Sequence, residues 1–372
     1  MGTTPLQQLA EHGQAVWIDY LSRPFVKDGD LEGLIRQGIV GATSNPTIFQ
    51  GAIAEGDAYD DQIRELVDAG ITEPKDVFLE LARDDIRDAC DLFEPVWDEG
   101  SGKDGWVSLE VDPNLAHDTQ GTIEEAKRLH AMVERDNLLI KIPATVEGLE
   151  AIEETIAAGI PVNVTLIFSL ERHRDVAEAY VRGLQRFVDG GGDPSRNMAS
   201  VASFFVSRVD TEADKRLDEA GGHDELKGTL AIANAKLAYQ TYKEVFSGEQ
   251  WDALAAKGAS PQRCLWASTS TKNPEYRDVI YVEELVGPDT VNTMPRETVE
   301  AVLDHGEIRG DTLAEDLEGA RKVLDDFKAA GIDYDDVVAT LEREGVEKFA
   351  KSFRDLFSDL ESKRDALVGA KA

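Results

Sequence analysis

Residues 137–145 read NLLIKIPAT, an apolar run that Lys141 interrupts and Pro143 closes. A short, wholly apolar strand of this kind is typical of a sheet that is covered on both faces. A lysine ammonium is costly to bury in such a strand unless it is paired or loses its proton. Since desolvation favours the neutral amine, which is the form that attacks a carbonyl carbon, Lys141 is a candidate for Schiff-base chemistry. The alternative is a lysine at a strand end whose ammonium reaches out to water.

Other short apolar runs also end in, or contain, polar residues that could serve an amine nucleophile. These residues are Asp19, Asn45, Glu110, Asn163, Thr165, Ser203, Arg208, Ser268 and Ser270. Asn163 and Thr165 are two residues apart, so in a strand they point to one side, where two inward polar groups are costly unless they serve a site. Of two separate carboxylates, one could manage the proton of a substrate hydroxyl and the other could handle water and the imine.

These runs correspond to eight predicted strands, each separated from the next by a segment with helical periodicity. The strands are expected at 16–20, 38–46, 106–113, 137–145, 161–169, 197–205, 263–271 and 290–295. We expect Thr119 or Thr122 to cap the helix between the third and fourth strands, and Ser169 to cap the helix after the fifth. Eight strand–helix alternations predict a (β/α)8 TIM barrel of the α/β class, in which the chemistry lies at the C-terminal ends of the strands.

The rest of the chain is predicted to add helices to this barrel. Residues 47–105 must hold more than one helix, and residues 296–372 read as a helical C-terminal addition. No low-complexity linker divides the chain, so residues 1–372 are expected to form a single barrel domain.

Composition excludes several classes of partner. The 372 residues are 42% hydrophobic and carry a net charge of −34, from 39 basic and 73 acidic residues, which argues against nucleic acid and anionic membranes as partners. No apolar run approaches about 18 residues, and the N-terminus lacks a signal pattern. Cys90 and Cys264 form no disulfide framework, so we expect a reduced, cytoplasmic protein. The histidines show no metal-ligand spacing and no phosphate-binding glycine motif follows a strand, so neither a metal nor an organic cofactor is expected.

Five motifs together resemble the transaldolase family. They are SNPT (44–47), SLE (108–110), IKIPAT (140–145), NVTLIF (163–168) and SFFVSRVD (203–210). The resemblance covers roughly residues 10–300, with motifs in the family's order, and the length and C-terminal helices are similar to the longer bacterial form. It implies a (β/α)8 barrel in which Lys141 forms the Schiff base with a dihydroxyacetone unit.

The resemblance also implies roles for the remaining candidates. Asp19 matches the residue that takes or gives the hydroxyl proton during carbon–carbon cleavage. Glu110 and Thr165 match the pair that positions the water for imine formation and hydrolysis. The matches to substrate-binding residues are Asn45 and Asn163 for the dihydroxyacetone hydroxyls, and Ser203 and Arg208 for the sugar hydroxyls and the phosphate.

The chain departs from the family pattern after the seventh strand. Where the family often has a second phosphate-binding arginine, residues 268–274 read STSTKNP and supply Lys272. A lysine binds phosphate as a point charge and cannot form the bidentate fork of a guanidinium. We expect the phosphate role to be kept by Lys272.

Five of these candidates also have a purely structural interpretation. Asp19 could cap a helix, and Glu110 could be a rim carboxylate paired with a base. Asn45 before a proline is a good turn residue, and Thr165 could simply fill a strand. Arg208 could pair with an aspartate two residues further along the chain.

The resemblance implies a transferase of the pentose phosphate pathway, a Schiff-base transaldolase acting on ketose and aldose phosphates. It would move a dihydroxyacetone unit from sedoheptulose 7-phosphate to glyceraldehyde 3-phosphate. One alternative is a lysine-dependent aldolase, similar to fructose 6-phosphate aldolase, that releases free dihydroxyacetone. The other, a non-catalytic barrel scaffold, would leave a buried lysine and several inward polar groups uncompensated.

Overall fold

The computed structural model describes residues 3–54 and 56–369, and its centre is a closed barrel of parallel strands. Each strand pairs with the next in the chain, and β8 pairs back with β1. The strands are β1 (Gln14–Ile18), β2 (Gly41–Ala42), β3 (Trp106–Glu110), β4 (Leu138–Pro143), β5 (Val162–Ile167), β6 (Ser200–Phe205), β7 (Arg263–Ala267) and β8 (Thr290–Met294). The predicted (β/α)8 barrel is therefore confirmed.

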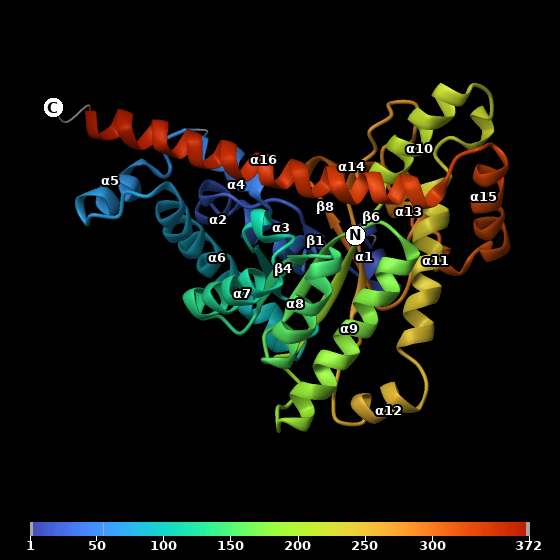
Figure 1. Ribbon diagram of the computed structural model, residues 1–372, viewed down its shortest axis with the longest axis horizontal. Coiled ribbons are helices and arrows are strands. Elements are labelled where there is room, and N and C mark those ends of the chain that lie inside the picture. The colour runs from blue at the N-terminus through green and yellow to red at the C-terminus, as the bar shows by residue number, and fades with distance from the viewer. Residues whose placement is uncertain (1–2, 55, 370–372) are drawn as a thin grey trace.

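Helices surround this barrel and extend beyond it (Figure 1). The α-helices are α1 (Pro5–Glu11), α2 (Arg23–Lys27), α3 (Asp30–Gln37), α4 (Pro46–Ala54), α5 (Asp60–Asp68), α6 (Pro74–Glu99), α7 (Thr119–Val133), α8 (Val146–Ala157), α9 (Leu170–Asp189), α10 (Ser207–Ala220), α11 (Leu230–Val245), α12 (Glu249–Ala255), α13 (Ile280–Glu284), α14 (Arg296–His305), α15 (Leu317–Ala329) and α16 (Tyr334–Gly369). Short 3₁₀ turns are η1 (Pro113–Leu115), η2 (Asp224–Leu226) and η3 (Thr312–Ala314). As predicted, several helices lie in 47–105, and residues beyond 296 are largely helical.

Two predicted strands are much longer than the observed ones. β2 has two residues, because Asn45 and Pro46 already begin the turn into α4. β7 ends at Ala267, because Ser268 adopts a left-handed backbone (φ 57°) that turns the chain. The prediction that Ser268 and Ser270 lie in a strand was therefore wrong, and both lie in the following loop.

The helix caps were predicted correctly at one of two positions. Ser169 caps α9, and its hydroxyl accepts a hydrogen bond from the amide of Arg172 at 2.9 Å. Asp118 caps α7 in place of Thr119 or Thr122, because a carboxylate one residue earlier already accepts from the amide of Gly121 at 3.0 Å. The Thr122 hydroxyl instead donates to the carbonyl of Leu115.

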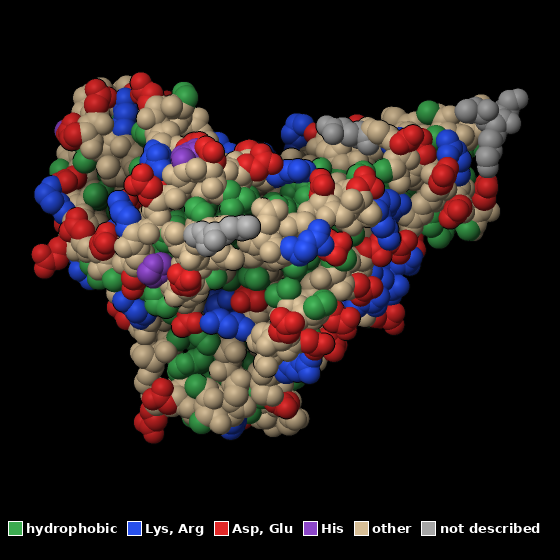
Figure 2. All heavy atoms as spheres, turned by 180° about the vertical axis from the view of Figure 1, so that it is seen from behind, with side chains coloured by type: hydrophobic (Ala, Val, Ile, Leu, Met, Phe, Trp, Pro, Cys, Tyr) green, Lys and Arg blue, Asp and Glu red, His purple; other side chains and the backbone are tan. Residues whose placement is uncertain are grey.

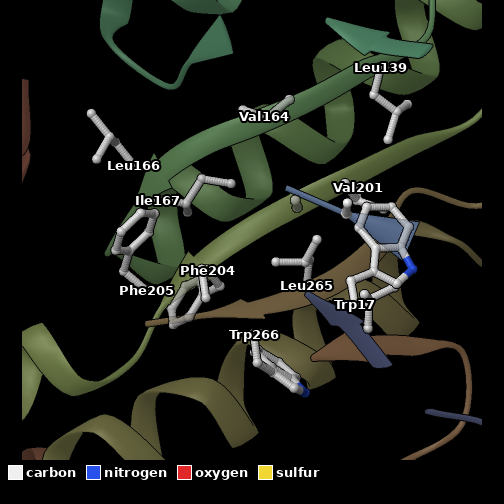
Figure 3. Packing of buried hydrophobic residues seen from close by; sticks show 14 of the residues in the cluster. Trp17, Leu139, Val164, Leu166, Ile167, Val201, Phe204, Phe205, Leu265 and Trp266 are labelled. Atoms are coloured by element: carbon white, nitrogen blue, oxygen red, sulfur yellow. The ribbon is translucent and has the colours of Figure 1, made fainter. Parts of the chain in front are cut away.

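The core continues from inside the barrel into the layer between strands and helices. Successive residues of β7 point to opposite sides, as Figure 3 shows for Leu265 and Trp266. Trp266 is fully buried and meets Phe204 of β6 edge-on, with ring centroids 6.1 Å apart. This two-sided burial explains why the strand sequences are almost continuously apolar.

The long helix α16 crosses the molecule from the region of α10 to that of α4 and α5 (Figure 1). Near its start, Arg216 of α10 binds Asp336 at 2.6 Å. At its middle, the Ser352 hydroxyl hydrogen-bonds that of Thr47 in α4 at 2.8 Å. α16 therefore lies across the end of the barrel at which α4 and α10 begin. Within the described ranges, no helix combines the length and the apolar character needed to cross a membrane.

Acidic side chains cover much of the surface. On the face shown in Figure 2, Lys and Arg side chains are interspersed among Asp and Glu rather than gathered in one basic patch. Many basic side chains form ion pairs, such as Arg186 with Glu154 and Arg296 with Asp30.

Candidate active site

A cavity of about 230 Å³ opens at the C-terminal ends of the strands. Nine of the predicted candidates line it, namely Asp19, Asn45, Lys141, Thr165, Ser203, Arg208, Ser268, Ser270 and Lys272. The other two, Glu110 and Asn163, lie directly behind this lining, in contact with Lys141 and Ser203 respectively. The barrel topology thus gathers all eleven candidates at one end, as predicted.

Lys141 is buried in the middle of β4, and its side chain is 6% exposed. Its Nζ donates to the carbonyl oxygen of Ser44 at 3.1 Å and lies 3.2 Å from Glu110 Oε2. The amine does not extend along the strand to water, so the structural alternative for this residue is wrong. A buried amine that faces a cavity and has an adjacent carboxylate is suited to attack a carbonyl group.

Glu110 and Thr165 lie on the strands that flank Lys141, β3 and β5. Burial raises the pKa of the Glu110 carboxyl, although the neighbouring Lys141 ammonium opposes this. Thr165 Oγ1 is buried and has no hydrogen-bond partner among residues 3–54 and 56–369, and Glu110 Oε2 is buried with the Lys141 amine as its ion-pair partner. A carboxylate and a hydroxyl on either side of the amine could therefore hold a water molecule or a substrate hydroxyl.

A local irregularity of β5 positions Thr165. The register between β5 and β6 shifts between Val164 and Ile167, and Leu166 adopts a left-handed backbone (φ 59°). Such a bulge re-aims the neighbouring side chains, and non-glycine residues adopt this backbone rarely and at an energetic cost. Thr165, immediately before the bulge, faces the cavity.

Asp19 follows β1 and lines the same cavity. The Thr43 hydroxyl donates to Asp19 Oδ1 at 2.7 Å, and since Thr43 has one hydroxyl hydrogen, Thr293 must donate to Thr43. Burial raises the pKa of Asp19, against the opposing effects of Lys141, this hydrogen bond and Arg208. Asp19 does not cap a helix, because Ser22 caps α2. A carboxyl with a raised pKa beside a cavity is suited to general acid–base chemistry.

Asn163 forms part of a hydrogen-bonded chain beneath the cavity. Its amide donates to Ser108 Oγ at 3.0 Å, and its carbonyl oxygen accepts from Ser203 Oγ at 2.7 Å. Both Asn163 and Ser203 are fully or almost fully buried. Asn163 keeps one further amide hydrogen, which it could donate to a bound hydroxyl.

Asn45 has both a structural role and a place in the site. Its side-chain oxygen accepts from the amide of Ile48 at 3.0 Å, which caps the first turn of α4. It also lines the cavity, where its NH₂ group remains a donor.

The cationic end of the cavity contains Arg208 and Lys272. Arg208 packs over the rings of Phe205 and Phe349, with its guanidinium carbon 4.9 and 5.8 Å from their centroids. It does not pair with Asp210, whose carboxylate accepts from the amide of Ala231 and the hydroxyl of Tyr281 instead. Burial lowers the pKa of Arg208, and Asp19 and Glu110 oppose that effect. Lys272 donates to Ser270 Oγ at 2.7 Å.

Sequence reasoning missed several residues that line the same cavity. They are chiefly Thr43, Thr293, Glu297, Lys348 and Phe349. Thr43 and Thr293 follow or end short strands, so the same end-of-strand argument could have found them. Lys348 and Phe349 come from α16, where the apolar spacing of Phe349, Phe353 and Leu356 signals a buried face but not what that face covers.

Comparison with known proteins agrees with this geometry. A family model described as "Transaldolase/Fructose-6-phosphate aldolase" matches residues 16–360. The chain is 54% identical over 356 residues to the transaldolase of Acidothermus cellulolyticus, covering 95% of each chain. It is 53% identical over 372 residues to that of an Arthrobacter species, covering 99% of each. It is 51% identical over 373 residues to "Transaldolase 2" of Streptomyces coelicolor, covering 99% of this chain and all of that one.

Proposed function

Since the chain belongs to the transaldolase and fructose-6-phosphate aldolase family, we infer that it is a transaldolase that works through a Schiff base on Lys141. The reaction moves a dihydroxyacetone unit from sedoheptulose 7-phosphate to glyceraldehyde 3-phosphate, which gives erythrose 4-phosphate and fructose 6-phosphate in the pentose phosphate pathway. The observation that carries this proposal is the buried Lys141 amine, which faces the cavity 3.2 Å from the Glu110 carboxylate.

In the first step, the neutral Lys141 amine attacks the ketone carbon of the donor sugar. Glu110 accepts a proton from the amine and returns it to the carbinolamine hydroxyl, which leaves as water when the imine forms. Thr165 holds that water from the other flanking strand. The reverse sequence, with water attacking the imine, releases the product.

In the second step, Asp19 removes the proton from the hydroxyl two carbons beyond the imine carbon. The bond from that hydroxyl-bearing carbon to the carbon next to the imine carbon breaks, its electron pair moves to the protonated imine, and the hydroxyl-bearing carbon leaves as the aldehyde of an aldose phosphate. The enamine that remains attacks the aldehyde carbon of the acceptor, and Asp19 returns the proton to the new hydroxyl. No metal or organic cofactor is needed, because the protonated imine is the electron acceptor.

The remaining residues hold the substrate. Asn45 and Asn163 bind the hydroxyls of the dihydroxyacetone unit, and Ser203 binds a sugar hydroxyl. Arg208 and Lys272 bind the phosphate, which fixes the sugar at the end remote from the imine and brings the reacting carbons to Lys141 and Asp19. Arg208 contributes the bidentate fork and Lys272 a point charge.

The runner-up activity is that of a fructose 6-phosphate aldolase, whose name the family description also contains. The full-length relatives at 51–54% identity are transaldolases, which supports the transferase. A coupled assay distinguishes the two. With fructose 6-phosphate alone, a transaldolase releases little dihydroxyacetone, and adding erythrose 4-phosphate produces sedoheptulose 7-phosphate. Rapid release of free dihydroxyacetone without an acceptor would favour the aldolase.

The proposal also covers the domain organisation, location and partners of the protein. We take residues 1–372 as one barrel domain with 296–372 as its helical addition, and the cytoplasm as its location. The free, buried thiols of Cys90 and Cys264 are compatible with a reducing compartment. Ketose and aldose phosphates are the expected partners, while nucleic acid is not, because the acidic surface repels it.

A further inference from the structure

The middle of α16 supplies two consecutive residues, Lys348 and Phe349, to the wall of the cavity. The Phe349 ring lies between the two ends of the site, because its centroid is 5.6 Å from Lys141 Nζ and 5.8 Å from the guanidinium carbon of Arg208. Lys348 therefore enters the site beside the ring that separates the imine end from the cationic end.

Lys348 belongs to a group of three cations at that end of the cavity. All three line the cavity, and the charge of Arg208, then burial, then the charge of Lys272 lower the pKa of Lys348. Across residues 3–54 and 56–369, none of the three lies within ion-pair distance of a carboxylate. Arg208 is partly buried and partly offset by the nearby Asp19 and Glu110, whereas Lys272 and Lys348 are exposed and form no ion pair within the described part of the chain, so the two lysines leave positive charge available to an anion.

The same three residues also line a second hollow, a groove of about 720 Å³ that runs along α16. These three residues line both hollows, so they lie at the junction between the cavity and the groove. A phosphate bound there would leave the carbon chain of the sugar pointing inward to Lys141, and a longer sugar could place its charged end further out.

Two contacts fix the position of α16 over the site. The Ser352 hydroxyl, one turn beyond Lys348, hydrogen-bonds Thr47 of α4 at 2.8 Å. One turn before Lys348, Gly345 lies so close to β5 that an added Cβ would come within 3.0 Å of the Leu166 side chain. The backbone of α16 is therefore fixed on both sides of Lys348, by a hydrogen bond at Ser352 and by close packing at Gly345. This fixes the position from which the Lys348 side chain extends.

We propose that Lys348 is a specificity-determining residue that binds the sugar phosphate together with Arg208 and Lys272. This inference rests on the proposed function for the identity of the sugar. The binding of a phosphate dianion by Lys348 can nevertheless be tested without turnover. Lys272, in place of the usual second arginine, supplies one point charge, and Lys348 supplies another from α16.

The test compares Lys348→Gln, Lys348→Arg and wild type, with Lys351→Gln as the matched control. Lys351 lies one turn further along α16, lines the groove but not the cavity, and forms an ion pair with Asp355. Two quantities are measured, namely binding of inorganic phosphate by titration calorimetry, and kcat/KM for fructose 6-phosphate and for unphosphorylated fructose with a common acceptor.

We expect Lys348→Gln to weaken phosphate binding and lower kcat/KM for fructose 6-phosphate by about tenfold, mainly through KM. The change with fructose should be under about twofold, Lys348→Arg should restore both quantities, and Lys351→Gln should resemble wild type. Equal losses in Lys348→Gln and Lys351→Gln, or equal losses with both sugars, would overturn the proposal.

Failure of the proposed function would look different. Wild type would then show no transfer to an acceptor aldehyde, whatever its affinity for phosphate. If Lys348→Gln does not fold, Lys348→Met can replace it and be compared with Lys348→Arg. Methionine removes the charge and arginine keeps it, with side chains of similar length.

Discussion

Glu110 and Lys141 lie directly opposite one another on the neighbouring parallel strands β3 and β4, and Glu110 Oε2 is 3.2 Å from Lys141 Nζ. Both side chains are almost completely buried. Asp19 and Arg208 add a second carboxylate and a second cation close by, since each affects the pKa of Glu110 and of the other. The four charges offset one another's burial, which allows an amine and two carboxylates to remain inside an apolar barrel.

The first prediction separates the two carboxylates. Asp19→Asn keeps the shape of the side chain but removes the base, so carbon–carbon cleavage should slow by about 10²–10⁴-fold while imine trapping continues. Glu110→Gln should instead slow the formation of the imine itself. Rapid-quench trapping with borohydride measures both steps, and an unchanged trapping rate in Glu110→Gln would count against its role in moving protons to and from water.

The second prediction concerns the phosphate end. Arg208→Ala should lower kcat/KM for fructose 6-phosphate. The loss of transition-state stabilisation should be about 2–5 kcal/mol, as expected for one partner of a largely desolvated charge pair. It should have a much smaller effect on fructose. Lys272→Ala should show the same selectivity with a smaller loss, because Lys272 is exposed and offers a single point charge. Equal harm to both sugars from Arg208→Ala would mean that Arg208 is structural and that the phosphate binds elsewhere.

A third prediction tests the packing that fixes β2. An added Cβ at Gly41 would come within 2.6 Å of the buried ring of Trp17, so Gly41→Ala should destabilise the fold by about 1–3 kcal/mol. Gly51 in α4 is the matched control, because nothing lies within 4 Å of an added Cβ there. Gly51→Ala should be neutral or stabilising by up to about 1 kcal/mol. Denaturant unfolding of the two variants should separate them, and equal midpoints would show that β2 relaxes without cost.

A fourth prediction concerns stability and pH at Asp210, whose pKa burial raises from 3.8 to about 7. The folded state then holds this proton more tightly than the unfolded state does, so the unfolded state releases it first as pH rises from about 4 to 7. In the wild type, Asp210 therefore lowers the free energy of unfolding as pH rises across that window. Asp210→Asn has no titrating group at this position, so it lacks this pH-dependent loss. The melting temperature of Asp210→Asn minus that of wild type should increase from pH 4.5 to pH 8. A constant or decreasing difference would contradict the assignment.

Much of the fold could be predicted from the sequence because buried parallel strands leave a strong local signal. Eight apolar runs alternating with amphipathic segments predict the barrel, and the barrel brings the ends of those runs together. This pattern predicts that Lys141, Asp19 and Glu110 meet, although they are far apart in the chain. It overestimated β2 and β7, since the turns at Asn45 and Ser268 depend on a helix cap and on a left-handed backbone rather than on hydrophobicity.

The part of the site that could not be predicted depends on packing between distant segments. Lys348 reaches the cavity only because α16 lies across the barrel mouth, and no local pattern states where a long amphipathic helix docks. The bulge at Leu166, which directs Thr165, could not be predicted from the sequence either, because a leucine in an apolar run gives no indication of a left-handed backbone.

The most direct test of the account is the mass of the peptide that contains Lys141 after borohydride reduction in the presence of fructose 6-phosphate. The account predicts a stable adduct of one reduced dihydroxyacetone unit or of the whole sugar on that peptide. It also predicts that Lys141→Ala loses both the adduct and nearly all transfer activity. An adduct on a different lysine, or an active Lys141→Ala protein, would contradict it.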